Sequence, residues 1–193
     1  MTAVFPLYYF GNIAYWQAIL AENEIVYATK QSIAKKSYSN RTIILMANGL
    51  QTLTVPLIGG RGSKTLFDEI EISYAENWIA KHKMALQSAY AKSPYYEFYI
   101  PYFGNILDAK PILLLDLNKA IFKEILRLLK LKKEVIDSKD MATINFIPSQ
   151  FDNHLTDYPQ VFRYKSPFQP DLSILDLLFC LGPKAIDYLS ERH

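Results

Sequence analysis

The chain has 193 residues, of which 50% are hydrophobic and 21% charged, so we predict a folded protein of one domain and exclude a disordered one. Its net charge of +2 and its dispersed lysines and arginines predict no nucleic-acid partner, and no segment approaches the roughly 18 apolar residues of a membrane span. Cys180 is the only cysteine, which excludes an internal disulfide and, with no visible signal peptide, predicts a cytoplasmic location.

The N-terminal part is predicted to form a small strand–helix–strand unit. Residues 3–5 are a short apolar start, Asn12 can cap a helix over residues 13–21, and residues 25–28 favour a strand. Two strands with a helix between them are typical of a βαβ unit, in which the strands lie parallel.

A β-hairpin is predicted next. Residues 42–47 and 52–57 are β-prone, and residues 48–51 join them through Asn48-Gly49, a pair typical of tight hairpin turns. Further along, residues 69–73 alternate in polarity and favour a third strand, with Ile70 and Ile72 on one face.

Three helices are predicted in the middle of the chain. Asn77 begins the first, which runs to residue 90 or 92 and carries Trp78 and His82 on one row. The second covers residues 95–107 and is expected to be interrupted near Pro101. The third is amphipathic and covers residues 118–131. Residues 112–115 fit either a strand or a helical turn.

The C-terminal part combines strands, an extended segment and a capped helix. Residues 133–137 and 143–147 are candidate strands. Three prolines predict an extended chain over residues 158–171. Ser173 can then cap a helix that ends at Gly182, and the proline after it suits the first turn of another helix.

Because helices and strands are interleaved, the predicted fold class is α/β or α+β. The expected architecture is a single domain over residues 1–193, with a mixed sheet that contains the βαβ-like unit and the hairpin. Amphipathic helices are expected to cover this sheet.

His82 is the titratable residue with the most functional promise. Of three histidines, it alone lies on an apolar helical row, between Trp78 and Leu86. A partly buried imidazole can act as a general base, and the alternative is a core histidine whose ring nitrogens are satisfied by hydrogen bonds. The chain lacks HxxxH, HxH and CxxC spacings, so no metal site and no cofactor are expected.

Three cations are candidates for anion binding. Arg61 and Lys64 lie in the glycine-rich loop of residues 59–65, which lacks the glycine that a P-loop has immediately before its lysine. The alternative is a loop of solvated charges. Arg41 stands at a strand start, where it can bind a carboxylate or phosphate or form a structural ion pair.

Two residues of the C-terminal helix also need an assignment. Asp176 is either a polar group directed into a groove or a first-turn residue favoured by the helix dipole. Cys180 is flanked by apolar residues, which predicts a small buried hydrophobe and not a nucleophile.

With these segments in order, the chain resembles the WbqC-like proteins. The blocks that carry the resemblance are Asn40-Arg41, Asn48-Gly49, Leu53-Thr54-Val55-Pro56, Trp78 with His82, Tyr90, Ser93-Pro94-Tyr95, Tyr158 with Gln160, and Leu172-Ser173-Ile174-Leu175-Asp176-Leu177-Leu178 with Gly182. Their order and spacing extend over about residues 4–182. The family pattern usually opens with a Gln-Pro pair, and here Val4-Phe5-Pro6 keeps the proline without the glutamine.

The resemblance implies a transferase of the glycyl or related acyl type that acts on an amino sugar in surface-polysaccharide (O-antigen) biosynthesis. It makes His82 and Asp176 the candidate catalytic residues. The candidate substrate-binding residues are Arg41, Trp78, Tyr158 and Gln160, to which the glycine-rich loop adds Arg61 and Lys64. If the glutamine before Pro6 contributes to catalysis in the family, its absence here implies an altered or lost activity.

The alternative is a non-catalytic binding or assembly protein. The chain has 14 tyrosines, which can line a groove that recognises a sugar nucleotide, a lipid intermediate or a partner protein. No catalytic constellation is self-evident in the sequence, which favours this alternative. Under both interpretations a small-molecule ligand is expected, and the oligomeric state is left open.

Overall fold

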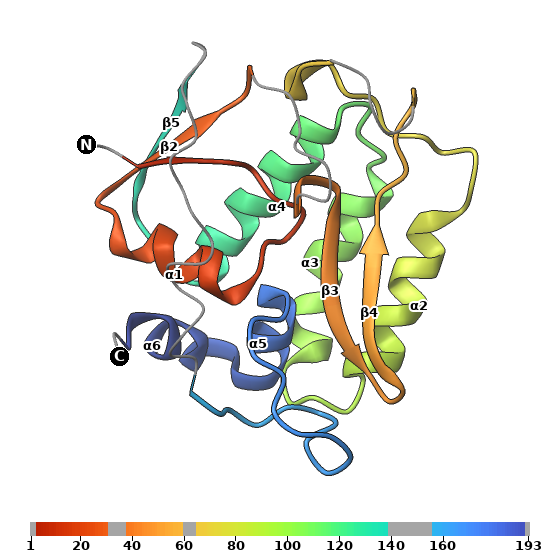
Figure 1. The fold of residues 1–193 in the computed structure, drawn as a ribbon, viewed down its shortest axis with the longest axis vertical. Helices are drawn as coiled ribbons and strands as arrows, with labels where there is room; N and C mark the ends of the chain where they lie inside the picture. The colour runs from red at the N-terminus through yellow and green to blue at the C-terminus, as the bar shows by residue number, and fades with distance from the viewer. Residues whose placement is uncertain (1–2, 31–37, 60–64, 139–155, 192–193) are drawn as a thin grey trace.

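The N-terminal unit forms a parallel sheet around the first helix. The computed structural model describes residues 3–30, 38–59, 65–138 and 156–191 (Figure 1). Strand β1 (Val4–Phe5) pairs in parallel with β2 (Glu24–Ala28), and α1 (Ile13–Ala21) connects them. Strand β5 (Glu134–Ser138) joins the other edge of β2, also in parallel. The predicted βαβ unit and the strand predicted at residues 133–137 are confirmed.

The predicted hairpin is also confirmed, with a shorter turn. Strands β3 (Arg41–Met46) and β4 (Gly49–Thr54) are antiparallel, and Met46 pairs with Gly49. The turn is therefore two residues long, and three of the four residues assigned to it belong to β4. Gly49 has φ of 120°, a backbone conformation that side chains with a Cβ rarely adopt.

The third strand predicted over residues 69–73 is wrong. Residues Phe67–Glu69 form a short 3₁₀ helix, and only isolated bridges follow, from Leu57 to Ile72 and from Glu71 to Leu113. Because each bridge joins a single pair to a different segment, no continuous ladder forms. The alternating polarity reflects the burial of Ile70 and Ile72 in the core and not strand pairing.

The helices predicted in the middle of the chain form with altered bounds. Helix α2 (Trp78–Tyr90) begins as expected, because the Asn77 side chain accepts from the N–H of Ala80. Helix α3 (Tyr96–Asp108) is continuous, and the expected interruption at Pro101 is wrong. Pro101 is exposed, so the backbone carbonyl that its missing N–H leaves free can be hydrated.

Helix α4 (Leu114–Leu128) begins four residues before the predicted start at Asn118. Asn118 is fully buried inside the helix, and its amide donates to the backbone carbonyls of Leu7 at 3.0 Å and Ser39 at 2.8 Å. Asparagine is common at helix starts, but here its side chain joins α4 to the segments that contain Leu7 and Ser39. Residues 112–115 thus divide between a bridge and the first helical turn.

The C-terminal helices follow the predicted boundaries. Ser173 caps α5 (Ile174–Leu181), and Gly182 ends it with φ of 56°. A 3₁₀ turn, Gly182–Lys184, contains the following proline and leads into α6 (Ala185–Ser190). The strand predicted at residues 143–147 lies outside the described residues.

The extended chain predicted over residues 158–171 is partly wrong, because residues 161–166 form a turn. Backbone N–H groups of Arg163 and Lys165 donate to the carbonyls of Gln160 and Phe162. A proline restricts its own φ and the residue before it, so the residues between Pro159 and Pro167 are free to fold back.

The elements assemble around one large apolar core. Figure 1 shows the parallel sheet at the upper left and the hairpin right of centre beside α2, with α4 between them in this view. The architecture is a mixed α/β single domain, as predicted, but the expected mixed sheet is wrong, because the parallel strands and the hairpin form two separate sheets. Within the described residues, no helix is both long and apolar enough to cross a membrane.

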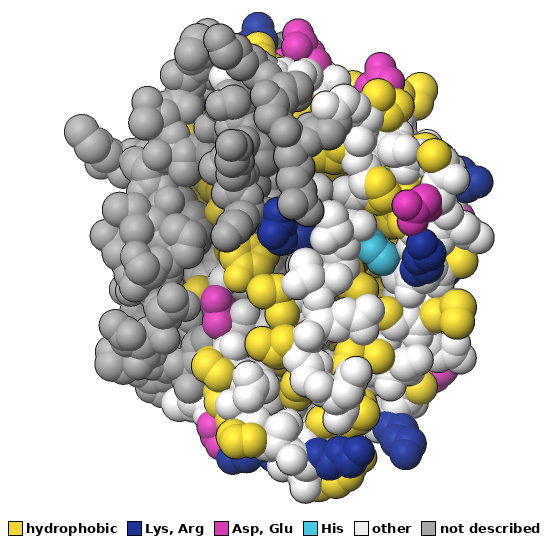
Figure 2. Space-filling model, turned by 45° about the vertical axis from the view of Figure 1, so that its right-hand side comes forward, with side chains coloured by type: hydrophobic (Ala, Val, Ile, Leu, Met, Phe, Trp, Pro, Cys, Tyr) yellow, Lys and Arg dark blue, Asp and Glu magenta, His cyan; other side chains and the backbone are white. Residues whose placement is uncertain are grey.

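Charged side chains of both signs are interspersed on the face shown in Figure 2. Ion pairs join Lys81 to Glu76 at 2.8 Å and Lys83 of α2 to Asp108 of α3 at 2.6 Å. Such exposed pairs contribute at most about 1 kcal/mol each. The surface charges therefore add little to the stability of the fold.

Candidate functional site

Asp176 lies at the centre of a buried hydrogen-bond network. It occupies the first turn of α5, and only 1% of the residue is exposed. The Tyr158 hydroxyl donates to its Oδ2 at 2.5 Å, and Nε2 of Gln160 lies 3.4 Å from the same oxygen. The structure thus brings together three of the predicted site residues.

The surroundings of Asp176 shift the pKa of its carboxyl group. Burial raises the pKa of Asp176 from 3.8 to about 6, although Tyr158, Tyr90 and Gln160 oppose the rise by stabilising the carboxylate. Tyr90 acts from outside hydrogen-bond geometry, since its buried hydroxyl has no hydrogen-bond partner among the described residues. A carboxyl with this pKa can exchange a proton near neutral pH.

The side chain of Gln160 also closes a loop over this network. Its Nε2 donates to the carbonyl of Gln169 at 2.8 Å, and the N–H of Gln169 donates back to its Oε1 at 3.0 Å. Residues 160–169 are called the strap below. The backbone of Val161 in the strap is hydrogen-bonded to the Cys180 thiol, which lies one turn after Asp176 on α5.

The N-termini of α1 and α5 meet beside the strap and fix the position of α5. Asp171, with φ of 55°, accepts from the Asn12 amide at 2.5 Å and from the N–H of Ala14 at 2.9 Å. The N–H of Ile174 donates to the carbonyl of Gly11 at 3.0 Å. The Asp171 carboxylate therefore supplies negative charge where two helix N-termini place partial positive charge.

His82 is the centre of a second buried cluster. The Tyr9 hydroxyl lies 2.9 Å from Nδ1, and the ring makes a hydrogen bond with the backbone of Thr54. Trp78 meets the imidazole edge-on, with 5.0 Å between ring centroids. Only 5% of His82 is exposed, so its place on an apolar row has led to burial.

Burial also determines the charge of His82. Desolvation lowers the pKa of the imidazole from 6.5 to about 4, and the Thr54 bond opposes this in part. The ring is therefore neutral at pH 7, with one nitrogen that accepts and one that donates. Tyr9 and Thr54 match these two needs, which is what a satisfied core histidine requires.

Arg41 and Trp78 carry buried nitrogen atoms with no hydrogen-bond partner among the described residues. These atoms are Nε of Arg41 and Nε1 of Trp78. Arg41 pairs with Thr54 across the hairpin, so it lies one strand away from the backbone that bonds His82. Arg61 and Lys64 lie outside the described residues.

The two clusters are separate. Tyr90 and His82 lie eight residues apart on one face of α2, which corresponds to roughly 12 Å along the helix. The aspartate cluster consists of Tyr90, Tyr158, Gln160 and Asp176, and the histidine cluster consists of Tyr9, Thr54, Trp78 and His82. Tyr158, Gln160 and Asp176 therefore lie near one end of α2, and Trp78 and His82 lie near the other.

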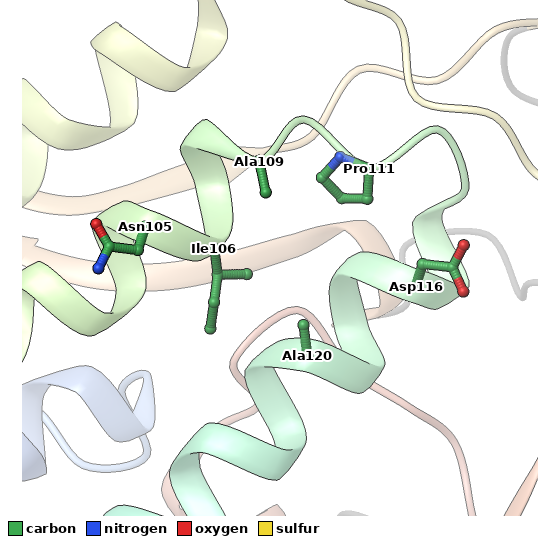
Figure 3. Close-up of a pocket in the computed structure, with 6 residues that line it drawn as sticks. All are labelled: Asn105, Ile106, Ala109, Pro111, Asp116 and Ala120. Atoms are coloured by element: carbon green, nitrogen blue, oxygen red, sulfur yellow. The ribbon is translucent and has the colours of Figure 1, made fainter.

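A cavity of about 300 Å³ lies elsewhere, between α3 and α4 (Figure 3). Ile106 of α3 and Ala120 of α4 point toward one another across it. Its other lining residues are Asn105, Ala109, Pro111 and Asp116. None of the predicted site residues lines this cavity.

Comparison with known proteins gives one result. A model of the WbqC-like protein family matches residues 7–151, well over half of the chain. The chain belongs to the WbqC-like protein family. Neither the curated proteins nor the solved structures contain a match.

The WbqC-like match divides the candidate residues. It includes Arg41, Trp78 and His82, and it ends before Tyr158 and Asp176. Phe5, the residue before Pro6, is 1% exposed and packs edge-on against Tyr15. The position at which the resemblance implies a glutamine therefore makes an apolar core contact.

Three members of these clusters, Tyr9, Thr54 and Tyr90, were not predicted as site residues. Tyr9 binds His82 but lies in an aromatic run in which nothing distinguishes it, and 73 residues separate the pair. Tyr90 had a usable signal in this WbqC-like chain, since it stands on the row of His82, four residues apart at each step. Within the described ranges, no group of three or more His, Cys, Asp or Glu side chains is arranged to hold a metal ion.

Proposed function

We propose that this protein is a transferase of the glycyl or related acyl type that acts on the amine of an amino sugar in surface-polysaccharide (O-antigen) biosynthesis. The family resemblance motivates the substrate class, and the single cysteine supports a cytoplasmic location. The observation that carries the proposal is the 2.5 Å hydrogen bond from Tyr158 to Asp176.

Acyl transfer to an amine needs a group that takes up a proton. With a pKa of about 6, the Asp176 carboxyl is ionised at neutral pH and is a stronger base than an ordinary aspartate. Tyr158 is hydrogen-bonded to this carboxylate and can relay a proton to it. Gln160 orients both groups, because Nε2 lies 3.2 Å from the Tyr158 hydroxyl and 3.4 Å from Asp176.

In the proposed step, the sugar amine attacks the carbonyl carbon of an acyl ester or thioester. The new N–C bond forms, and the bond from the acyl carbon to its oxygen or sulfur leaving group breaks. The amine proton passes to the Tyr158 oxygen while Tyr158 gives its own proton to Asp176. Asp176 then returns a proton through the same tyrosine to the leaving group, so that no further reactant is needed.

The histidine cluster has a separate part in the proposal. His82 is the second candidate proton acceptor, and the partnerless nitrogens of Arg41 and Trp78 are donors for a carboxylate or phosphate of the substrate. Arg61 and Lys64 are proposed to add positive charge to this substrate binding. Replacement of His82 by Gln tests its role, because loss of turnover with an intact fold would make it catalytic.

The test of the relay uses a UDP-linked amino sugar with a free amine, glycyl and acetyl thioesters as donors, and mass spectrometry of the product. Tyr158→Phe and Asp176→Asn should each lower the rate roughly 10²- to 10⁴-fold. Tyr188→Phe is the matched control, since this neighbouring hydroxyl donates to the Thr156 carbonyl. Unchanged rates in both relay variants would refute the assignment.

A non-catalytic binding protein is the second candidate, and burial favours it. Asp176 is 1% exposed and His82 5%, and both groups have hydrogen-bond partners inside the protein. A thermal-shift series with UDP-sugars and acyl thioesters distinguishes the candidates. Binding of a UDP-sugar without any product, unchanged in Asp176→Asn, would support the binding protein.

A further inference from the structure

We propose that the strap, residues 160–169, opens as a unit over Asp176 and Cys180, and that the Gln160 side chain is the latch that holds it closed. The strap is an irregular segment between Tyr158 and the Asp171 cap of α1. Its function as the access route to Tyr158 rests on the transferase proposed above. The opening itself does not.

The latch is a pair of hydrogen bonds at the neck of the strap. The Gln160 amide bonds both the carbonyl and the N–H of Gln169, so one side chain joins the two ends. The hydrogen bonds inside the strap are local ones within the 161–166 turn, such as that from Lys165 to Phe162. They can persist while the neck opens, which allows the segment to move as one body.

The apolar contacts of the strap are few: Phe162 lies in a small separate cluster, and Val161 and Phe168 pack at the edge of the main core. Phe162 is 8% exposed and packs with Leu45 and Leu172 in a cluster of its own. Withdrawal of this ring therefore leaves the main core of the molecule packed. A segment held by few apolar contacts opens at a lower free energy than the whole protein unfolds.

The strap covers the groups that the proposed reaction needs. The Val161 backbone contacts the Cys180 thiol, and the Phe168 ring meets the Tyr158 ring edge-on at 5.3 Å. When the strap lifts, Gln160 and Phe168 leave Tyr158 together. The Tyr158 hydroxyl, which is buried in the closed form, then faces solvent beside Asp176.

The single cysteine makes this opening measurable on the unmodified chain. Cys180 is the only thiol and is buried, and burial raises its pKa, so its reaction with N-ethylmaleimide reports exposure through opening. Labelling rates are measured against urea concentration by mass spectrometry, and global unfolding is followed in parallel by circular dichroism. Local opening has a weak urea dependence, and global unfolding has a steep one.

Gln160→Ala should label roughly ten- to thirtyfold faster than the wild type without urea, as expected for the loss of two neutral hydrogen bonds. Gln169→Ala is the matched control and should label at the wild-type rate, because Gln169 uses its backbone in the latch. Phe162→Ala removes the buried ring of the strap and should also accelerate labelling.

The proposal is overturned if labelling of every variant has the steep urea dependence of global unfolding, or if Gln160→Ala and Gln169→Ala label at equal rates. Because labelling uses no substrate, it separates the two proposals. Fast labelling of Gln160→Ala together with full activity of Asp176→Asn would retain the strap and reject the proton relay. The reverse pattern would retain the relay and reject the strap.

Discussion

Replacement of Asp176 by Asn should change the pH dependence of stability. The pKa of this carboxyl is raised from 3.8 to about 6 in the folded protein. Such a group stabilises the fold fully below its unfolded pKa, and this contribution is lost as the pH rises through the folded pKa. At about 1.4 kcal/mol for each tenfold change in proton affinity, the wild type should lose roughly 3 kcal/mol from this group between pH 3 and pH 7.

Asn at this position does not titrate, so this slope should be absent from the variant. The hydrogen bond from Tyr158 changes as well, but in the variant neither Tyr158 nor the introduced amide titrates in this range, so the variant adds only a constant offset. The measurement is urea unfolding followed by circular dichroism at a series of pH values. The decisive quantity is the free energy of unfolding of the wild type minus that of Asp176→Asn, which should fall by roughly 3 kcal/mol across the range.

Asp187→Asn is the matched control, since Asp187 is an exposed aspartate in the first turn of the neighbouring helix α6. The difference in the free energy of unfolding between the wild type and Asp187→Asn gives the effect of losing an ordinary first-turn carboxylate. A flat difference between the wild type and Asp176→Asn over pH 4–7 would show that burial has not raised the pKa of Asp176. The proton relay would then lose its base.

Three further changes test other parts of the structure. His82→Gln should remove a pH dependence of the free energy of unfolding that has the opposite sign. Because the pKa of His82 is lowered to about 4, its contribution to stability is complete above pH 6.5 and is lost as the pH falls toward 4. A variant whose free energy of unfolding has the same pH profile as the wild type would contradict this. Asp171→Ala should lower the free energy of unfolding by about 1–2 kcal/mol in urea titrations, because two donors at the start of α1 lose their acceptor; Asp187→Ala serves as the comparison. Gly182→Ala should lower the melting temperature by several degrees, since φ is 56° and a Cβ would lie 2.5 Å from the Tyr95 ring; an unchanged melting temperature would refute that close approach.

Local signals predicted most of the helix boundaries correctly. Asn12, Asn77 and Ser173 each accept from a backbone N–H two or three residues later, and Gly182 ends α5 with a positive φ. Caps depend on neighbours within one helical turn, so one sequence contains what they need. The hairpin was predictable for the same reason, since its two strands adjoin a single turn.

The errors arose where a local preference met a tertiary partner. Pro101 was expected to interrupt α3, but its exposed position lets the helix continue. Asn118 was expected at a helix start, but the carbonyls of Leu7 and Ser39 hold it inside α4. In both cases propensity is a preference of about 1–3 kcal/mol, which solvation or long-range hydrogen bonds can offset.

The mixed α/β class, the helix caps and the candidate residues can all be inferred from the sequence. How those residues are grouped depends on the folded chain: Tyr158, Gln160 and Asp176 lie in one cluster, His82 and Trp78 in another. Folding also brings Tyr9 to His82 across 73 positions and Asp171 to the start of α1 across 157. The physical reason is the distance along the chain between the residues that interact. Caps and turns are contacts between neighbours in the chain, whereas burial and its effect on a pKa depend on segments that only folding brings together.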